Sequence, residues 1–259
     1  MNWMRYFSIL FSLLLIPVVC FGGVDFNGDA DYINLGNNAS LFIDTPITIG
    51  CWTKDANPAD DYIFSIGKSQ NDRWGFHCAD TSGNLWVWDD IDNGNTSIQT
   101  TVDISSGNHC IVITIDGTAG TNIYVDGSTS DGSNAGRTLG FDSIGTTDSI
   151  VGIGHAILWD GTPTDFFNGE ITEFFLSASI WSATQIDSFC NGRLKGYPQN
   201  DASLVDYWSL DEHPAGTNLN GAVFKAVPTG NDGTGVDANA NSTIVGETVL
   251  SYPSQILGN

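Results

Sequence analysis

Residues 166–191, FFNGEITEFFLSASIWSATQIDSFCN, decide the fold class of this 259-residue chain. From Ile171 onward, apolar and polar side chains alternate, a pattern typical of a half-buried β-strand. Ser182 then precedes Ile186 and a second apolar residue one turn later, which is typical of a capped helical turn. The stretch therefore predicts a strand followed by one short helix near 182–190.

The rest of the chain has the composition of an all-β protein. It contains 30 Gly, many short alternating runs and turn dipeptides such as Asp126-Gly127, and it lacks long helical periodicity after the N-terminus. One β-sandwich can hold roughly 200 to 250 residues. We therefore expect a single domain over residues 23–259.

Five segments in chain order carry a family resemblance. They are VDFNGDADYI (24–33), ITIGCWTK (47–54), IFSIGK (63–68), the paired HCIVITIDG and IYVDG (109–127), and the closing stretch quoted above. Together they resemble the laminin-G-like and pentraxin-like domains of the concanavalin A-like class. The resemblance implies a two-sheet antiparallel jelly-roll β-sandwich that is used mostly for binding.

The first 22 residues have the features of a signal peptide. Arg5 lies in a short polar start, residues 7–19 are continuously apolar, and the small residues Cys20 and Gly22 suit signal peptidase. The apolar run is shorter than the roughly 20 residues of a spanning helix. We expect cleavage after Gly22, no membrane insertion of the mature chain, and a secreted or cell-surface location. An uncleaved membrane anchor is the alternative.

The charge of the chain excludes several partners. The net charge is −22, and loss of Arg5 with the leader would leave 7 basic and 30 acidic residues, or −23. Nucleic-acid binding needs cationic side chains, so that class is not expected, and anionic membranes are disfavoured. The acids are 26 Asp and only four Glu. Short carboxylates on loops suit Ca²⁺, but they equally suit a solvated acidic surface.

Four cysteines remain after the leader. An even count in an exported chain predicts two disulfides with three connectivities, and four buried thiols are the alternative. The pentraxin resemblance implies a Cys51–Cys110 disulfide, which leaves Cys78 and Cys190 as the second pair.

A calcium site is implied by the same resemblance. KSQND (68–72) resembles the pentraxin segment that supplies calcium oxygens, with its last two residues exchanged, and the family's further acids come from the loop before the closing strand. The implied ligands are Asn71, Asp72, Asp160 and Asp165. Hydrogen-bonding turn residues are the alternative interpretation.

A second calcium candidate lies in the opening hairpin. Asp29 and Asp31 flank Ala30, and residues two apart on a strand face the same way. An ion between the two carboxylates would relieve their repulsion. The alternative is that the second Asp only caps a turn.

The tryptophans raise the question of a ligand. Leu85-Trp86-Val87-Trp88 alternates, so the two indoles project from one face of a strand. If Leu85 and Val87 enter the core, the indoles form an outer platform suited to sugar rings, which Trp159 would extend. The alternative is that Trp86 and Trp88 are core residues.

Catalysis is not expected from this sequence. Retaining glycosidases need two carboxyl groups roughly 5 Å apart. Glu170 and Glu173 are three apart on a predicted strand, so we expect them on opposite faces. The histidines lack a nucleophile motif such as G-x-S-x-G.

The segment 203–259 is a C-terminal extension whose start, residues 204–212, resembles the opening of such a module. It either completes the same sandwich or pairs with an exposed edge of a neighbouring subunit. The sequence thus predicts a secreted, non-catalytic glycan-binding or adhesion module, with Ca²⁺ as its candidate cofactor. The alternative is a self-associating subunit of a fibre, coat or surface layer.

Overall fold

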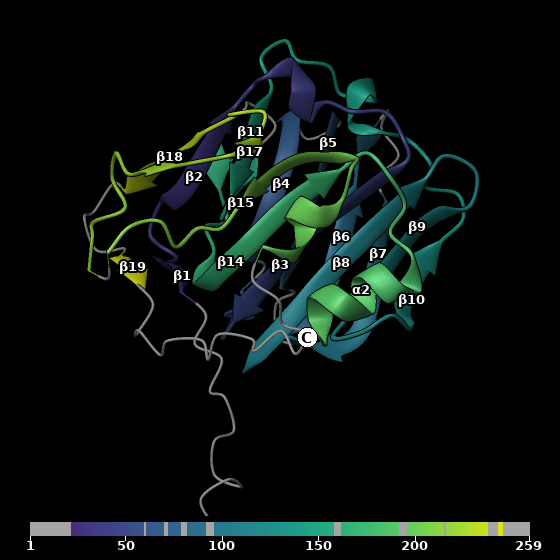
Figure 1. Cartoon of the computed structure of the whole chain (residues 1–259), viewed down its shortest axis with the longest axis horizontal. Helices are drawn as coiled ribbons and strands as arrows, with labels where there is room; N and C mark the ends of the chain where they lie inside the picture. The colour runs from purple at the N-terminus through teal and green to yellow at the C-terminus, as the bar shows by residue number, and fades with distance from the viewer. Residues whose placement is uncertain are drawn as a thin grey trace, which may run out of the picture.

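Two antiparallel β-sheets pack face to face in this chain (Figure 1). The structure is a computed structural model that describes residues 22–59, 61–69, 72–78, 82–91, 96–157, 162–191, 196–214, 216–237 and 243–245. The expected signal peptide, except Gly22, lies outside the described residues. Over the described ranges, no helix is long and apolar enough to cross a membrane. The predicted two-sheet jelly-roll sandwich is confirmed.

Sheet A holds the opening and closing strands of the domain side by side. Its order is β10 (Ser130–Asn134), β9 (Gly120–Val125), β8 (Asn108–Asp116), β3 (Ile47–Lys54), β14 (Asn168–Ser177), β1 (Gly23–Asn27) and β19 (Thr243–Val245). Two more strands join it, because β15 (Leu204–Trp208) pairs with β14 and β17 (Val227–Pro228) pairs with β15.

Sheet B carries the tryptophan-rich strand. Its order is β16 (Val223–Phe224), β18 (Gly233–Asp237), β2 (Asp31–Gly36), β11 (Ile150–Ile153), β4 (Asp61–Ser69), β5 (Asp72–Cys78), β6 (Asn84–Asp89) and β7 (Thr96–Asp103). A small hairpin of β12 (Ala156–Ile157) and β13 (Pro163–Thr164) follows β11. Short 3-10 turns occur at Ala39–Leu41 (η1), Phe141–Ser143 (η3) and Tyr197–Asn200 (η4).

The main core fills the space between the sheets. Phe174 of β14 illustrates it, because its ring lies 5.0 Å from Phe64 of sheet B and 5.9 Å from Trp208 of sheet A, between ring centroids. All three side chains are almost fully buried. Burial of large aromatic side chains is the main favourable contribution to such a fold.

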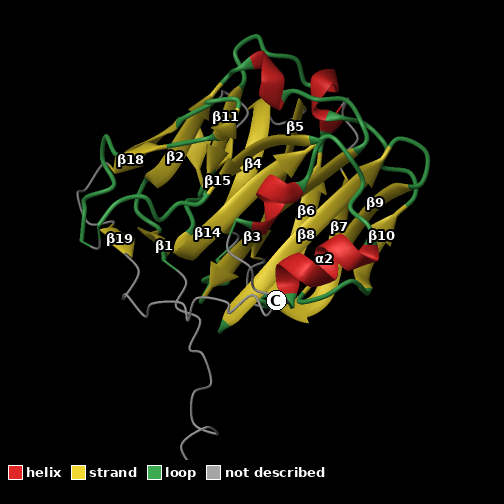
Figure 2. Ribbon diagram, in the orientation of Figure 1, coloured by secondary structure: helices red, strands yellow, loops and turns green. Residues whose placement is uncertain are grey.

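The short helix predicted near 182–190 is α2 (Ala183–Cys190), and Figure 2 shows it lying across the strands of sheet A. Ser182 forms a capping box: its Oγ accepts from the Gln185 backbone N–H, and its own N–H donates to Gln185 Oε1 at 3.0 Å. A second apolar cluster under α2 includes Phe175, Trp181 and Phe189. The outer face of sheet A is therefore covered at its centre.

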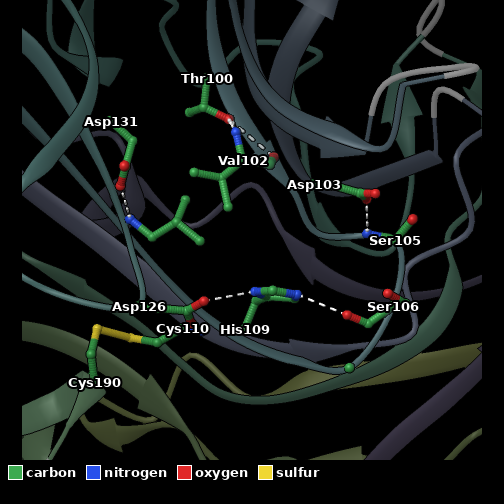
Figure 3. A network of polar contacts seen from close by, with 12 residues as sticks. Thr100, Val102, Asp103, Ser105, Ser106, His109, Cys110, Asp126, Asp131 and Cys190 are labelled. Atoms are coloured by element: carbon green, nitrogen blue, oxygen red, sulfur yellow. Dashed lines mark hydrogen bonds and ion pairs between the residues drawn. A yellow bond between two sulfur atoms is a disulfide. The ribbon is translucent and has the colours of Figure 1, made fainter.

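The predicted disulfide pairing is wrong. Cys110 of β8 is bonded to Cys190 of α2 (Figure 3), while Cys51 is a buried free thiol. The reason is the strand register: Cys51 lies opposite Ile111, so it faces the main core, whereas Cys110 lies opposite Trp52 and faces α2. Cys78 keeps its thiol, with Sγ 3.5 Å from the Gly83 carbonyl oxygen.

The described strands after Ala202 pair within this chain. β15 extends beside β14, β18 pairs with β2, and β19 pairs with β1. The C-terminal extension thus adds strands to both sheets, and the edges of β1 and β2 are covered by the chain's own backbone.

Candidate functional site

The candidate site lies on the outer face of sheet B, where β6 presents its tryptophans. Leu85 and Val87 are completely buried in the main core, and Trp86 and Trp88 are half-buried on the opposite face. This is the orientation that the platform interpretation requires. The two indoles are two residues apart on one strand, about 7 Å along its axis.

An aromatic row continues from Trp86 across the neighbouring strands. His77 of β5 lies opposite Trp86, and Tyr62 of β4 lies opposite His77. The Tyr62 and His77 rings are stacked, with centroids 4.6 Å apart and an interplanar angle of 7°. The His77 and Trp86 rings meet edge to face at 5.8 Å. Side chains opposite each other in an antiparallel sheet contact directly, so this row fixes the Trp86 ring.

Trp88 is held by a separate polar cluster. The Arg73 guanidinium lies over its ring, 5.9 Å from the centroid. Arg73 Nε donates to Asp90 Oδ2 at 3.2 Å, and Trp88 Nε1 donates to the same oxygen. Arg73 also donates to the Ile157 carbonyl oxygen at 2.8 Å. Because every group is tied to another, the Trp88 ring is oriented before any ligand arrives.

The segment around the β12–β13 hairpin divides this face into a covered and an open half. Ser65 of β4 points outward yet is only 1% exposed, and His155 is fully buried. His155 folds over Gly152, where an added Cβ would lie 2.1 Å from its Nε2, and it meets Tyr32 edge to face at 4.7 Å. The β6–β7 part of this face reaches the surface, where Trp86 and Trp88 are half-buried and Ser97 and Gln99 are exposed.

Trp86 carries an unsatisfied donor. Its Nε1 is buried and has no hydrogen-bond partner among the described residues. Buried polar groups in folded proteins are nearly always paired, so such a group needs an explanation. An ordered internal water would satisfy it.

The structure describes two of the four implied calcium ligands, Asp72 and Asp165, and it does not bring these two together. Asp72 closes the β4–β5 hairpin opposite Ser69, and its carboxylate lies 3.4 Å from Lys68 Nζ. Asp165 lies at the other end of β4, where its carbonyl accepts from the Tyr62 N–H. Seven residues of extended strand, roughly 23 Å, separate the two positions. Asn71, Asp160 and the third tryptophan, Trp159, lie outside the described residues.

The two carboxylates of the second calcium candidate, Asp29 and Asp31, lie in different environments. Ala30 adopts a left-handed conformation with φ 64°, which breaks the alternation on which the expectation rested. As a result Asp29 is exposed in the turn, while Asp31 is fully buried at the start of β2. The described residues hold no group of three or more His, Cys, Asp or Glu side chains that could hold a metal ion.

The expectation that Glu170 and Glu173 face opposite sides of their strand is wrong. Glu173 has φ 54° at a β-bulge between Thr172 and Phe175, and the extra residue returns it to the outer face of sheet A. Glu170 lies 3.6 Å from Lys54 Nζ. Glu173 accepts from the Tyr207 hydroxyl at 2.7 Å and from the Gly196 N–H at 2.6 Å. Both are less than a tenth exposed and engaged in structural contacts.

Sequence reasoning missed Arg73, His77 and Tyr62 as parts of this face. A signal for two of them exists in DRWGFHC (72–78), where buried Trp74 and Phe76 alternate with Arg73 and His77. Because alternate residues of a strand lie on the same face, the alternation in β5 places Arg73 and His77 together on the face opposite the core, as it does Trp86 and Trp88 in β6.

The fold and the aromatic face together define a concanavalin A-like β-sandwich with a surface suited to ligand binding. The chain belongs to the Concanavalin A-like lectin/glucanases superfamily, whose laminin-G family model matches residues 27–196. The strands after Ala202 lie beyond this match. No curated protein matches the chain in sequence.

Solved structures share the fold at low sequence identity. A protein described as a putative carbohydrate binding protein from Bacteroides ovatus matches with a TM-score of 0.62 at 20% identity, over 90% of this chain and 62% of that chain. The Ruminococcus gnavus IT-sialidase CBM40 bound to α2,3-sialyllactose matches with a TM-score of 0.54 at 11% identity, over 64% of this chain and 96% of that one. The present chain thus spans less than two thirds of the first protein's length.

Proposed function

We propose that this protein is a non-catalytic, extracellular glycan-binding module whose ligand lies over Trp86 and Trp88. The observation that carries the proposal is the pair of half-buried indoles side by side on an outer sheet face, each oriented by its own set of contacts. Indole rings stack on the apolar faces of sugars, and a ring fixed in advance loses little entropy on binding.

The comparisons support the class of ligand. The Bacteroides ovatus protein is described as a putative carbohydrate binding protein, and the Ruminococcus gnavus module was solved with a sialylated sugar. Carbohydrate-binding and laminin-G-like domains commonly work outside the cell, which agrees with the signal-peptide features of residues 1–22. The described strands that a fibre subunit would donate are paired internally, so we do not favour self-assembly.

Calcium stays a prediction from sequence. The described members of the implied set, Asp72 and Asp165, do not fit one shared ion, because β4 separates them and Lys68 already neutralises Asp72. Thermal unfolding of the mature protein with Ca²⁺ and then with a chelator tests it. A rise in the unfolding temperature that the chelator reverses would support a calcium site.

The proposed function is tested by screening the mature protein on a glycan array and measuring the best ligand by calorimetry. Trp86→Ala and Trp88→Ala should each weaken binding by roughly fivefold, since aromatic contacts contribute on the order of 1 kcal/mol. Tyr124→Ala is the matched control, a half-buried aromatic residue that packs against the second cluster on sheet A. Equal affinities in all four proteins would reject the proposed site.

A further inference from the structure

We infer that the Trp86–Trp88 face selects neutral glycans and rejects those that carry a carboxylate or sulfate. This inference rests on the proposed function and names its ligand class. The positions of the chain's positive charges, and the groups that already neutralise them, support it.

Arg73 lies at the platform, and its guanidinium is held by an ion pair and by a backbone carbonyl. Its Nε donates to Asp90 at 3.2 Å, another of its nitrogens donates to the Ile157 carbonyl oxygen, and its Cζ lies over the Trp88 ring, 5.9 Å from the centroid. The Arg73 and Asp90 side chains are only 14% and 5% exposed. An ion pair this deeply buried is costly to break, because it would leave an uncompensated charge. Arg73 therefore positions Trp88 and does not offer a free guanidinium to a ligand anion.

The other described lysines and arginines are engaged as well. Lys54 pairs with Glu170, Lys68 with Asp72, and Lys225 with Asp232. Arg137 donates to Thr96 and interacts electrostatically with Asp89. Thus each of the five Lys and Arg residues in the described ranges already has an acidic or hydrogen-bonding partner. The chain as a whole carries −22, so an anionic glycan also meets a repulsive field.

The open side of the platform suits hydroxyl groups instead. Gln99 of β7 lies opposite Trp86, and Ser97 lies opposite Trp88, and both are exposed. An amide and a hydroxyl each donate and accept hydrogen bonds, as sugar hydroxyls do. Stacking and uncharged hydrogen bonds are what this face provides.

The test is an array on which each neutral oligosaccharide is printed beside its copy bearing a terminal sialic acid, uronic acid or sulfate. We expect the neutral member to bind, and the charged member to bind about tenfold more weakly or not at all. Equal or stronger binding of the charged members would overturn the inference while the proposed function stands. If neither member of any pair binds, the proposed function fails and the inference with it.

Two further measurements locate the cause. Asp90→Asn keeps an acceptor for Arg73 but removes one negative charge. The ratio of the affinity for the neutral glycan to that for its charged copy should therefore fall by about fivefold. Asp187→Asn is the matched control, because Asp187 is exposed on α2 over the opposite sheet. An unchanged affinity ratio in Asp90→Asn would overturn the role assigned to Asp90. In the unaltered protein, raising the salt concentration from about 20 to about 500 mM should lower this affinity ratio, because salt screens the repulsion between the protein and the anionic glycan. A ratio that rises with salt would contradict such a repulsion.

Discussion

The Nδ1 atom of His109 lies 2.8 Å from Asp126 Oδ2, and the other oxygen of that carboxylate accepts from the Cys110 N–H at 2.8 Å (Figure 3). On its far side, His109 Nε2 lies 2.9 Å from the Ser106 carbonyl oxygen. Both ring nitrogens face acceptors, so the doubly protonated imidazolium is the form that satisfies this site. The site adjoins Cys110, which anchors α2 to sheet A through its disulfide.

This geometry predicts a stability contribution that disappears at high pH. The hydrogen bond to Asp126 raises the pKa of His109 above its ordinary value of 6.5. A raised pKa means that the folded state holds the proton more tightly, so the contribution is complete below pH 6.5 and is lost as pH rises through the folded pKa. Urea unfolding should show His109→Gln to be less stable than the parent protein by about 1 kcal/mol at pH 5.5, with a smaller difference at pH 8.5. A difference that grows with pH would contradict the assignment.

His155 predicts a dependence of the opposite sign. Its complete burial lowers the pKa to about 4. The unfolded chain therefore binds more protons than the folded chain between about pH 6.5 and pH 4, and stability falls as pH is lowered through that window. The loss should reach about 3 kcal/mol at most. His155→Gln should be less stable at neutral pH but should have a flatter pH profile between 6.5 and 4. Parallel profiles for the two proteins would refute the prediction.

The disulfide assignment predicts a specific labelling pattern. Alkylation of the unfolded, unreduced mature protein followed by peptide mass spectrometry should label Cys51 and Cys78, whereas Cys110 and Cys190 should be labelled only after reduction. Cys190→Ser should lower the free energy of unfolding by about 2 to 4 kcal/mol, because the bond closes a long loop in the unfolded chain. Labelling of Cys110 before reduction would show that the pairing is different.

Most of the fold could be predicted because each strand shows a local alternation of apolar and polar residues. β14, α2 and β6 each follow from the period of their apolar residues and, for α2, from the capping pair Ser182 and Gln185. The wrong predictions concern places where the backbone departs from regular strand geometry, which the alternation of apolar and polar residues does not indicate. The bulge at Glu173 and the left-handed Ala30 each reverse the face on which a nearby carboxylate lies. The disulfide failed because it required the exact register of β3 against β8, in which Cys51 and Cys110 are offset by one residue.

Only part of the candidate site could be predicted from the sequence. Alternation placed Trp86 and Trp88 together on one face, but it could not say which face entered the core, since both faces of β6 are apolar. The contacts that orient the indoles come from β5 and from the segment after β11, where Ile157 lies 84 residues along the chain from Arg73, the residue that it holds. Such contacts are set by sheet order and not by local pattern.

The most direct test of the central claim is the response of the tryptophan indole N–H signals to the glycan selected on the array. In the ¹⁵N-labelled mature protein, Trp86 and Trp88 should shift on titration with a common affinity, and signals missing from Trp86→Phe and Trp88→Phe would assign them. The indoles of Trp181 and Trp208, which are buried under α2 and between the sheets, should stay in place. Shifts confined to Trp52 or Trp181 would instead place the ligand on sheet A and contradict the account.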